Sequence, residues 1–427
     1  MDKKIVKNSF WMMSEKVISI FGLIFVTAYV AKYVGPGVFG QISFSMSVFQ
    51  ITQIIAQLGS SVIIFKRISK KKNSGVILIN ATVFIRIIFY MFFSLPVVFY
   101  FLFYDFNNSF WFVFAAFLAC FFSSLDVYSI YYDATLKSKT NAMVNMFGLI
   151  VSLTLRWLIV RMEMDPIYIT IPMVLTSLIP YVMRAFSYRE NFKVTPFLNR
   201  HRRKYRRYLL YAGGSFVISD VSIAIYTRLS LLLLAVFATK EHVGVYSVAI
   251  SLAGSWSFIA MSFITSTLPS IFSEKDDLVA ENKTAKLTIY MILVCIPIIV
   301  SVYILGRWFL SYFYGYEYEK AFYPLMILCF STVASTLGTI SARFIARYSG
   351  YAFLSKKMLV VLISSVLLNL IFIPHFDIVG AAFATLITEI LSLTLFNYFF
   401  KKRVVAKLHI RTLMYPFLYI KSKFVSG

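Results

Sequence analysis

Long, uninterrupted apolar runs dominate this sequence, and most of them extend over roughly 20 residues, the length that spans a bilayer as a helix. An unpaired backbone amide in hydrocarbon costs several kcal/mol, so a chain crosses a membrane only as helices or as a closed barrel. Barrel strands would alternate polar and apolar residues in short segments, whereas these runs are continuous. The sequence therefore predicts an all-α polytopic membrane protein.

The composition agrees with this class of protein. Of the 427 residues, 59% are hydrophobic and 18% aromatic, and the mean hydropathy is +0.78, well above the range of soluble domains. The N-terminus "MDKKIVKNSFWMM" resembles the charged start of a signal peptide, but the apolar stretch from Phe10 to Ala31 is too long and no small-residue cleavage site follows. We interpret this stretch as the first permanent helix. The cysteines show no CxxC spacing and the four histidines are scattered, so we expect no metal site and no cofactor.

Apolar runs and the breakers between them predict twelve transmembrane helices. The spans cover about residues 10–31, 41–65, 76–104, 110–132, 141–160, 166–186, 209–237, 243–270, 287–313, 321–345, 357–374 and 378–400. We expect two six-helix halves, residues 1–190 and 209–400, with a basic linker at 191–208 between them and a basic tail at 401–427.

The formal charge of +24 could indicate nucleic-acid binding, but the distribution of Lys and Arg argues against it. Basic residues gather at the N-terminus, in alternate loops, in the tail and in "RAFSYRENFKVTPFLNRHRRKYRR", which begins at Arg184; Lys357 is also assigned to this side. The opposite loops hold only Lys32, Arg161, Lys240 and Lys320. The positive-inside rule therefore predicts that both termini are cytoplasmic.

The linker and the tail "KKRVVAKLHIRTLMYPFLYIKSKF" interleave cations with Tyr, Phe and Leu. This pattern is typical of an interfacial segment on anionic lipid, although enforcement of the topology alone would also explain it.

The stretch "YVGPGVFGQISFSMSVFQ", residues 33–50, places a glycine and proline hinge before a helix with a polar side. That side carries serines at 43, 45 and 47, followed by Gln50, Gln53 and Gln57. These residues either allow close helix packing or face a water-filled lumen. An offset of 204 residues aligns Gly40 with Gly244 and Ser47 with Ser251, which indicates two parallel repeats with a substrate path at their interface.

Ionisable side chains within the spans are the strongest candidates for function, because each is costly in a membrane. The basic ones are Lys16, Arg86, Arg156, Arg228 and Arg307; the last lies near a span end and favours a structural role. Internal ion pairs would explain all of them, but a cationic lumen suits phosphate or pyrophosphate.

Acidic residues in the spans are candidates for ion coupling: Asp126, Asp220 and Glu389. Asp126 and Asp133 are seven residues apart and are expected on one helix face. The 204-residue offset aligns Lys16 with Asp220, so these two side chains could form a bridge between the halves.

Four segments follow one another along the chain: the start with Asn8 and Trp11, the hinge "YVGPGVFGQISF", the echo "VGVYSVAIS" and the late "NLIFIP...DIVGAAFATLITE". Together they resemble the Wzx-type polysaccharide flippases, including the O-antigen flippases of lipopolysaccharide biosynthesis, in the multidrug/oligosaccharidyl-lipid/polysaccharide exporter superfamily. The resemblance implies a MATE-like fold and a multi-pass protein of the bacterial inner membrane. It implies that an undecaprenyl-pyrophosphate-linked oligosaccharide is moved to the periplasmic leaflet by alternating access. Such families place cations in a central cavity, and Lys16, Arg86, Arg156 and Arg228 are the positions here that could serve. Membrane lipid, a polysaccharide polymerase and a chain-length regulator are the implied partners.

Other classes of protein agree less well with the sequence. A small-molecule or drug exporter of the same superfamily would favour an acidic lumen, and here the embedded bases at least match the acids. An enzyme such as a polymerase or ligase would need larger outer loops than "YDFNNS" and "PHFDI", and the sequence has no nucleophile motif or glycine-rich phosphate loop. We therefore expect a transporter and not an enzyme; a scaffold or receptor role would leave the embedded charges without a purpose.

Overall fold

The computed structural model describes residues 3–104, 108–191 and 202–425. Most of the basic linker predicted at 191–208 therefore lies outside the described residues, and the tail is described to residue 425. Within these ranges the regular structure is entirely helical, as expected. The chain forms two compact units, Met1–Arg228 and Leu229–Gly427. The helix α9, first of the predicted second half, crosses the boundary between the two units.

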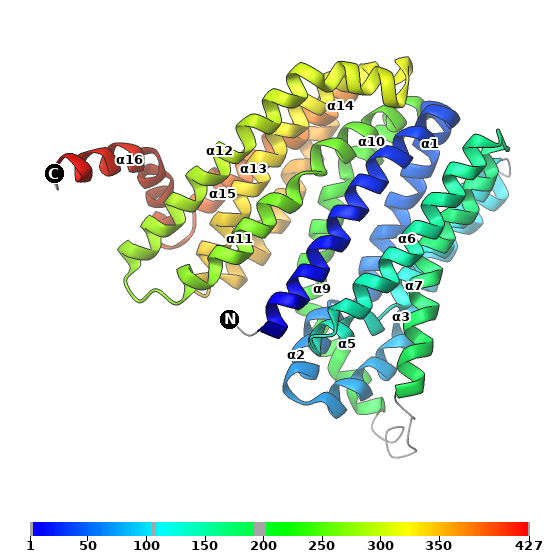
Figure 1. Cartoon of the computed structure of the whole chain (residues 1–427), viewed down its shortest axis with the longest axis horizontal. Helices are drawn as coiled ribbons and strands as arrows, with labels where there is room; N and C mark the ends of the chain where they lie inside the picture. The colour runs from blue at the N-terminus through cyan, green and yellow to red at the C-terminus, as the bar shows by residue number, and fades with distance from the viewer. Residues whose placement is uncertain (1–2, 105–107, 192–201, 426–427) are drawn as a thin grey trace. The chain divides into compact units, whose positions relative to one another are not determined.

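The N-terminal unit is a bundle in which α1 packs against α4 and α6, and α7 packs against the same two helices (Figure 1). Its elements are α1 (Lys3–Gln57), α2 (Ser60–Lys70), α3 (Lys72–Tyr104), α4 (Asn108–Leu125), α5 (Tyr128–Ala134), α6 (Ser138–Arg161), η1 (Pro166–Ile169), α7 (Thr170–Asn191) and most of α9 (Arg202–Phe237). Its largest core is aromatic: Phe49 of α1 and Tyr90 of α3 both contact Phe117 of α4, and the Tyr90 hydroxyl donates to the Phe117 carbonyl at 2.8 Å.

The C-terminal unit is built around α13, which packs against α10, α12 and α14. Its elements are α10 (Lys240–Gly254), α11 (Ser257–Phe272), α12 (Asp277–Phe309), η2 (Leu310–Tyr314), η3 (Tyr316–Ala321), α13 (Phe322–Arg347), α14 (Tyr351–Leu393), α15 (Leu395–Tyr398), η4 (Lys401–Arg403) and α16 (Val404–Val425). Four small residues of α14 are buried: Gly380, Ala381, Ala382 and Ala384. At Gly380 the two arms of α14 approach closely, since a Cβ there would lie 2.1 Å from the Phe372 carbonyl oxygen.

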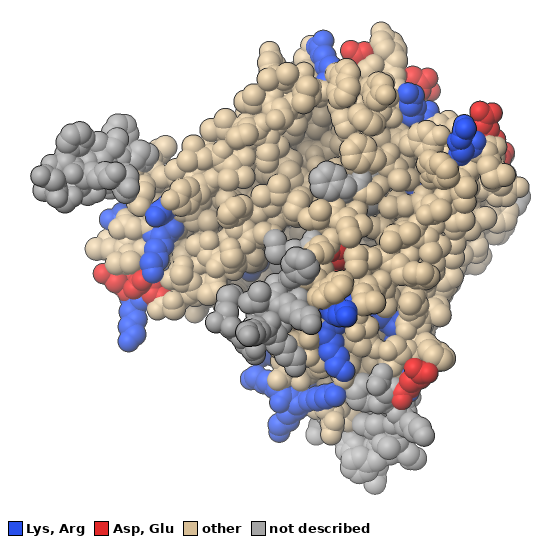
Figure 2. Space-filling view, viewed as in Figure 1, with Lys and Arg blue, Asp and Glu red and all other residues tan. Residues whose placement is uncertain are grey.

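Among the described residues, nine helices are long and apolar enough to cross a membrane, or ten if α4 and α5 form one bent span. On the face shown in Figure 2, charged side chains gather towards the ends of the helices and the surface between them is mostly uncharged. Many large apolar side chains of the described residues are exposed, among them Phe92, Tyr303 and Ile363. An exposed apolar surface of this extent is typical of a protein in contact with lipid.

Two of the longest helices contain one residue outside helical geometry. In α1 this residue is Gly35, with φ 74° and ψ 167°, immediately before Pro36. In α14 it is Asp377, with φ 51° and ψ −128°, three residues after Pro374. Glycine adopts positive φ without steric cost, and proline is well suited to the first turn of the next helix. The break predicted at "YVGPGV" is therefore confirmed.

Several predicted spans are not continuous helices; the span expected at 243–270, for example, is divided into α10 and α11. The span expected at 41–65 ends at Gln57, because Leu58 and Gly59 have φ of 49° and 57°, and α2 begins after them. The span expected at 110–132 is divided into α4 and α5, which are bent by 40°. Apolar residues lie on both sides of each break, so hydrophobic periodicity alone gives no sign of it.

Candidate functional site

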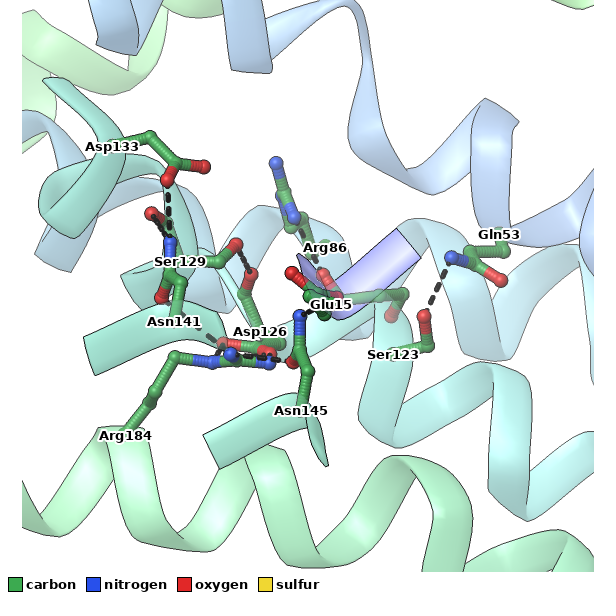
Figure 3. A network of polar contacts seen from close by, with 11 residues as sticks. Glu15, Gln53, Arg86, Ser123, Asp126, Ser129, Asp133, Asn141, Asn145 and Arg184 are labelled. Carbon is green, nitrogen blue, oxygen red and sulfur yellow. Dashed lines mark hydrogen bonds and ion pairs between the residues drawn. The ribbon is translucent and has the colours of Figure 1, made fainter. Parts of the chain in front are cut away.

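A buried polar network in the N-terminal unit is centred on Arg184 of α7 (Figure 3). The side chain is only 4% exposed. Its Nε donates to both carboxylate oxygens of Asp126, at 3.1 and 2.9 Å, and its Nη2 forms an ion pair with the same carboxylate. Asp126 lies in the short junction between α4 and α5. The ion pair therefore attaches this junction to α7.

Asn145 of α6 extends the network to the first helix. Its amide oxygen accepts from Nη1 of Arg184 at 2.8 Å, and its Nδ2 donates to Oε1 of Glu15 at 2.8 Å. Glu15 belongs to the arm of α1 that precedes Gly35. The amide thus relays a contact from a cation on α7 to a carboxylate on α1.

Asn141, one turn earlier on α6, makes a second branch. Its Nδ2 donates to the Ser129 carbonyl and to Oδ1 of Asp133, each at 2.8 Å, and the Ser138 hydroxyl also donates to Asp133 at 2.9 Å. Asp126 and Asp133 were predicted to share one face of a continuous helix. That prediction was wrong, because the chain bends between them. They are linked instead through Asn141, whose oxygen accepts from Arg184 at 3.5 Å.

Arg86 of α3 is 1% exposed, and both of its terminal nitrogens donate to protein groups. Nη1 donates to the Ser124 carbonyl at 2.6 Å and Nη2 to the Ser60 hydroxyl at 2.7 Å, while Nε is buried without a hydrogen-bond partner. Arg86 also interacts electrostatically with Asp126. These contacts connect α3 to the start of α2 and to the end of α4, so Arg86 has a clear structural role.

The other three predicted cations have different surroundings. Arg156 of α6 and Arg228 of α9 are half-buried, and Nε of Arg156 is buried without a hydrogen-bond partner. Lys16 is exposed on α1. Among the described residues, no ion pair is recorded for any of these three, and no contact joins them to Arg86. Arg307, expected to be structural, stacks on the rings of Phe322 and Tyr323.

The predicted glutamine side of α1 is partly buried. Gln53 donates to the Ser123 hydroxyl of α4 at 2.8 Å, whereas Oε1 of Gln50 is buried without a hydrogen-bond partner. Gln57 is half-buried, and its backbone carbonyl accepts from Ser60. The nearby hydroxyls of Ser45 and Ser47 are buried and donate to backbone carbonyls one turn earlier in α1. Small buried residues of this kind agree with close helix packing.

The remaining predicted acids lie apart from this network. Asp220 is exposed on α9. Glu389 of α14 is half-buried in the C-terminal unit and interacts electrostatically with Lys357. Lys357 itself is 6% exposed, and its Nζ donates to Oδ1 of Asn397 at 2.9 Å.

Sequence reasoning missed Arg184 and Lys357 as intramembrane residues. Both were assigned to cytoplasmic segments, yet α7 extends to Asn191 and α14 begins at Tyr351. Asp126 is an acid to which the sequence prediction gave no partner, and its negative charge could have indicated a buried cation such as Arg184. Among the described residues, no group of three or more His, Cys, Asp or Glu side chains could hold a metal ion.

Apolar helices of spanning length around a buried ionic network define a class of protein, the multi-pass helical membrane proteins. Two solved structures show the same fold. The lipid II flippase MurJ, in an inward closed conformation, has a TM-score of 0.68 at 15% identity and covers 97% of this chain and 93% of its own. An inward-facing multidrug resistance MATE family transporter of the MOP superfamily has a TM-score of 0.65 at 12% identity and covers 94% and 98%.

The family described as "Polysaccharide biosynthesis protein" matches residues 5–275, and the chain belongs to this family. It is also similar to the probable low-salt glycan biosynthesis flippase Agl15 of Haloferax volcanii, with 24% identity over 201 residues. That match covers 45% of this chain and 42% of the relative, less than half of its length. The relative and the solved structures named here are a flippase and transporters and not enzymes, in agreement with the expectation from the sequence.

Proposed function

We propose that this chain is a flippase that moves an undecaprenyl-pyrophosphate-linked oligosaccharide, an O-antigen or similar surface-glycan unit, from the cytoplasmic to the periplasmic leaflet by alternating access. Membership of the polysaccharide biosynthesis family supports a glycan substrate. Similarity to a relative described as a glycan biosynthesis flippase supports a lipid-linked one.

The observation that carries the proposal is the state of Arg156 and Arg228. Both guanidinium groups are half-buried in apolar helices, and neither has an ion pair among the described residues. A charge in such surroundings is costly unless an anion or water compensates it. A pyrophosphate would accept paired hydrogen bonds from a guanidinium group, so we assign substrate contact first to these two arginines. Lys16 is a third candidate. Arg86 is a weaker one, because its Nη1 and Nη2 already donate to protein groups.

We further infer twelve spans with both termini in the cytoplasm. The two longest apolar helical stretches, Ser14–Gln57 and Tyr351–Tyr398, have 44 and 48 residues, twice the length of a span, and each contains one of the breaks described above. Division at Gly35 and Asp377 turns the ten candidate spans into twelve. The excess of Lys and Arg on one side supports the orientation. The Wzx resemblance supports a bacterial inner membrane, and a polymerase and a chain-length regulator as partners.

We propose that a gradient of ions drives the transport. Asp126, Asp220 and Glu389 are the candidate carriers. Asp126 is held by Arg184, so coupling through Asp126 requires this pair to open. Asp220 is exposed on α9, and Glu389 interacts electrostatically with Lys357, so coupling through Glu389 would involve that lysine. Neutralisation of all three carboxylates with unchanged dependence of transport on the gradient would contradict the proposal.

The decisive experiment is flipping of a fluorescent polyprenyl-pyrophosphate oligosaccharide in proteoliposomes. We expect Arg156→Ala and Arg228→Ala to fold and to lose most of the flipping activity. Arg307→Ala is the matched control, because Arg307 is exposed and engaged with Tyr323 and Phe322. If all three variants flip the lipid like the wild type, the assigned arginines do not contact the substrate.

The alternative function is export of a small molecule or drug by the same fold. The same proteoliposomes distinguish it: a wild-type protein that ignores the lipid-linked sugar but exchanges a small organic cation is an exporter. In that case Arg156 and Arg228 are structural, and their replacement would not change the substrate preference.

A further inference from the structure

We propose that α16 is an interfacial helix that binds the anionic headgroups of the membrane on its outward face while its inward face is fixed to the C-terminal unit. Figure 1 shows α16 in red at one end of this unit. The proposal concerns the membrane surface, so it does not depend on which substrate the protein transports.

The inward face of α16 is attached by apolar contacts. Leu408 and Val405 are buried, and Leu408 belongs to a small core with Ala285 of α12 and Phe344 of α13. Thr412 is buried on the same face of the helix. These residues are three and four positions apart, which is the spacing of one helix face.

Two polar contacts fix the register of the helix. Nη1 of Arg411 donates to Oε2 of Glu281 on α12 at 2.6 Å. The ring of His409 lies between the hydroxyls of Ser341, at 3.2 Å from Nε2, and Tyr398, at 3.0 Å from Nδ1. The helix is therefore held in one orientation, and its opposite face is defined.

That opposite face is apolar. The exposed fractions of Ile410, Leu413 and Met414 are 57%, 75% and 52%, and their spacing of three and four residues places them together. Among the described residues, no side chain covers them. Exposed apolar residues at helical spacing are the part of an interfacial helix that enters the boundary between headgroups and acyl chains.

Cations precede this apolar patch by one to three turns. Lys401, Arg403 and Lys407 are exposed, and the structure records no ion pair for them among the described residues. The neighbouring carboxylates are already occupied: Glu274 by Lys283, Asp277 by Arg347 and Glu281 by Arg411. The segment that runs from η4 into α16 thus presents positive charge, on Lys401 and Arg403 of η4 and on Lys407 of α16, beside the exposed apolar side chains of α16. Anionic lipid headgroups complement both features, whereas a soluble acidic protein would complement only the charge.

The test measures the depth of a spin label in nanodiscs of phosphatidylcholine, with and without phosphatidylglycerol. Single cysteines replace Leu413 and Lys407 in separate variants, in a chain whose three buried cysteines are changed to alanine. With phosphatidylglycerol, we expect the label at 413 to collide more with oxygen than with a water-soluble nickel chelate, and the label at 407 to show the reverse. A label at 413 that favours the nickel chelate in both membranes overturns the proposal.

A second arm tests the charge. In the Leu413→Cys chain, Lys401→Glu with Lys407→Glu should shift the label towards water in the anionic membrane and abolish the difference between the two lipids. Lys66→Glu with Lys70→Glu is the matched control, because it changes the net charge equally on an exposed part of the N-terminal unit. Equal shifts in both double variants would contradict specific binding by α16. Shielding of the label from both reagents only at high protein density would assign the patch to a second copy of the chain and also overturn the proposal.

Discussion

Arg184 and Asp126 form a two-point ion pair between α7 and the bend that joins α4 to α5. Both side chains are almost completely removed from solvent, and the pair continues through Asn145 to Glu15 on α1. One cation therefore holds together helices that are far apart in the sequence. Arg184 therefore has a structural role in the N-terminal unit.

Removal of this cation should destabilise the protein strongly. Arg184→Ala leaves the Asp126 carboxylate buried and without its cation, and we expect the free energy of unfolding to fall by about 3–5 kcal/mol. Denaturant unfolding in detergent measures the change. Lys66→Ala is the control, since this cation is exposed on α2 and its loss should cost no more than about 0.5 kcal/mol. Equal effects of the two substitutions would show that the pair contributes nothing.

Replacement of Arg86 should reduce stability before it reduces transport. Arg86→Ala leaves the Ser124 carbonyl and the Ser60 hydroxyl without a buried donor, at a cost of about 1–3 kcal/mol for each unsatisfied group. Arg86→Lys keeps the charge but cannot reach both acceptors in the same way, so we expect only partial recovery. Thermal unfolding and flipping are measured on the same preparations. A stable Arg86→Ala protein that cannot flip the lipid would reassign this arginine to the substrate.

The close packing of the two arms of α14 predicts that Gly380 cannot be enlarged. A Cβ at this position would lie 2.1 Å from the Phe372 carbonyl oxygen and 2.6 Å from its carbon, both backbone atoms. Gly380→Ala should therefore destabilise the protein by at least about 1–3 kcal/mol. Gly338→Ala is the matched control, since no atom lies within 4 Å of its Cβ and alanine is the better helix former. The melting temperatures of the two variants should differ in opposite directions from the wild type.

His409 should make the stability depend on pH. Burial lowers the pKa of His409 below its usual value of 6.5. The unfolded chain therefore binds a proton before the folded chain does, and the free energy of unfolding should fall as the pH drops from 6.5 through the lower pKa of the folded state. More than about one unit above pH 6.5 both states are unprotonated at this residue, which should then contribute little slope.

Unfolding of His409→Gln, followed between pH 8 and about pH 5, checks this expectation. The variant should lose the acid-dependent part of the slope. His375→Gln, at an exposed histidine of the same unit, should retain it. A wild-type slope that survives in His409→Gln would assign the effect to another group.

The helical class and the hinge of α1 were predictable because both are local properties. Apolar runs of membrane-spanning length permit little except a helix, and Gly35 before Pro36 combines a residue that tolerates positive φ with one that starts a helix. The turn at Leu58 and Gly59 was not predictable in the same way. Leucine is uncommon at positive φ, and the surrounding residues continue the apolar pattern.

The buried network shows why the candidate site was only partly predictable. The sequence identified Arg86 and Asp126 as intramembrane charges, since each interrupts an apolar run. It placed Arg184 in the basic linker, because the arginine adjoins other cations and nothing local marks the end of α7. The asparagines on α6 carry no charge and gave no signal; their role follows from tertiary contacts with Arg184 and Asp133. Assignment of substrate contact to Arg156 and Arg228 stays a prediction.

The two arms of α1, before and after Gly35, make different polar contacts. The arm before it reaches α6 through Glu15 and Asn145, whereas the arm after it reaches α4 through Gln53 and Ser123. Because the hydrogen-bonded ladder of the helix is interrupted between these contacts, a displacement of one arm need not be transmitted to the other. The longest helix of the N-terminal unit thus consists of two helical segments joined at Gly35, and the direction of each segment is set by the residues that it contacts.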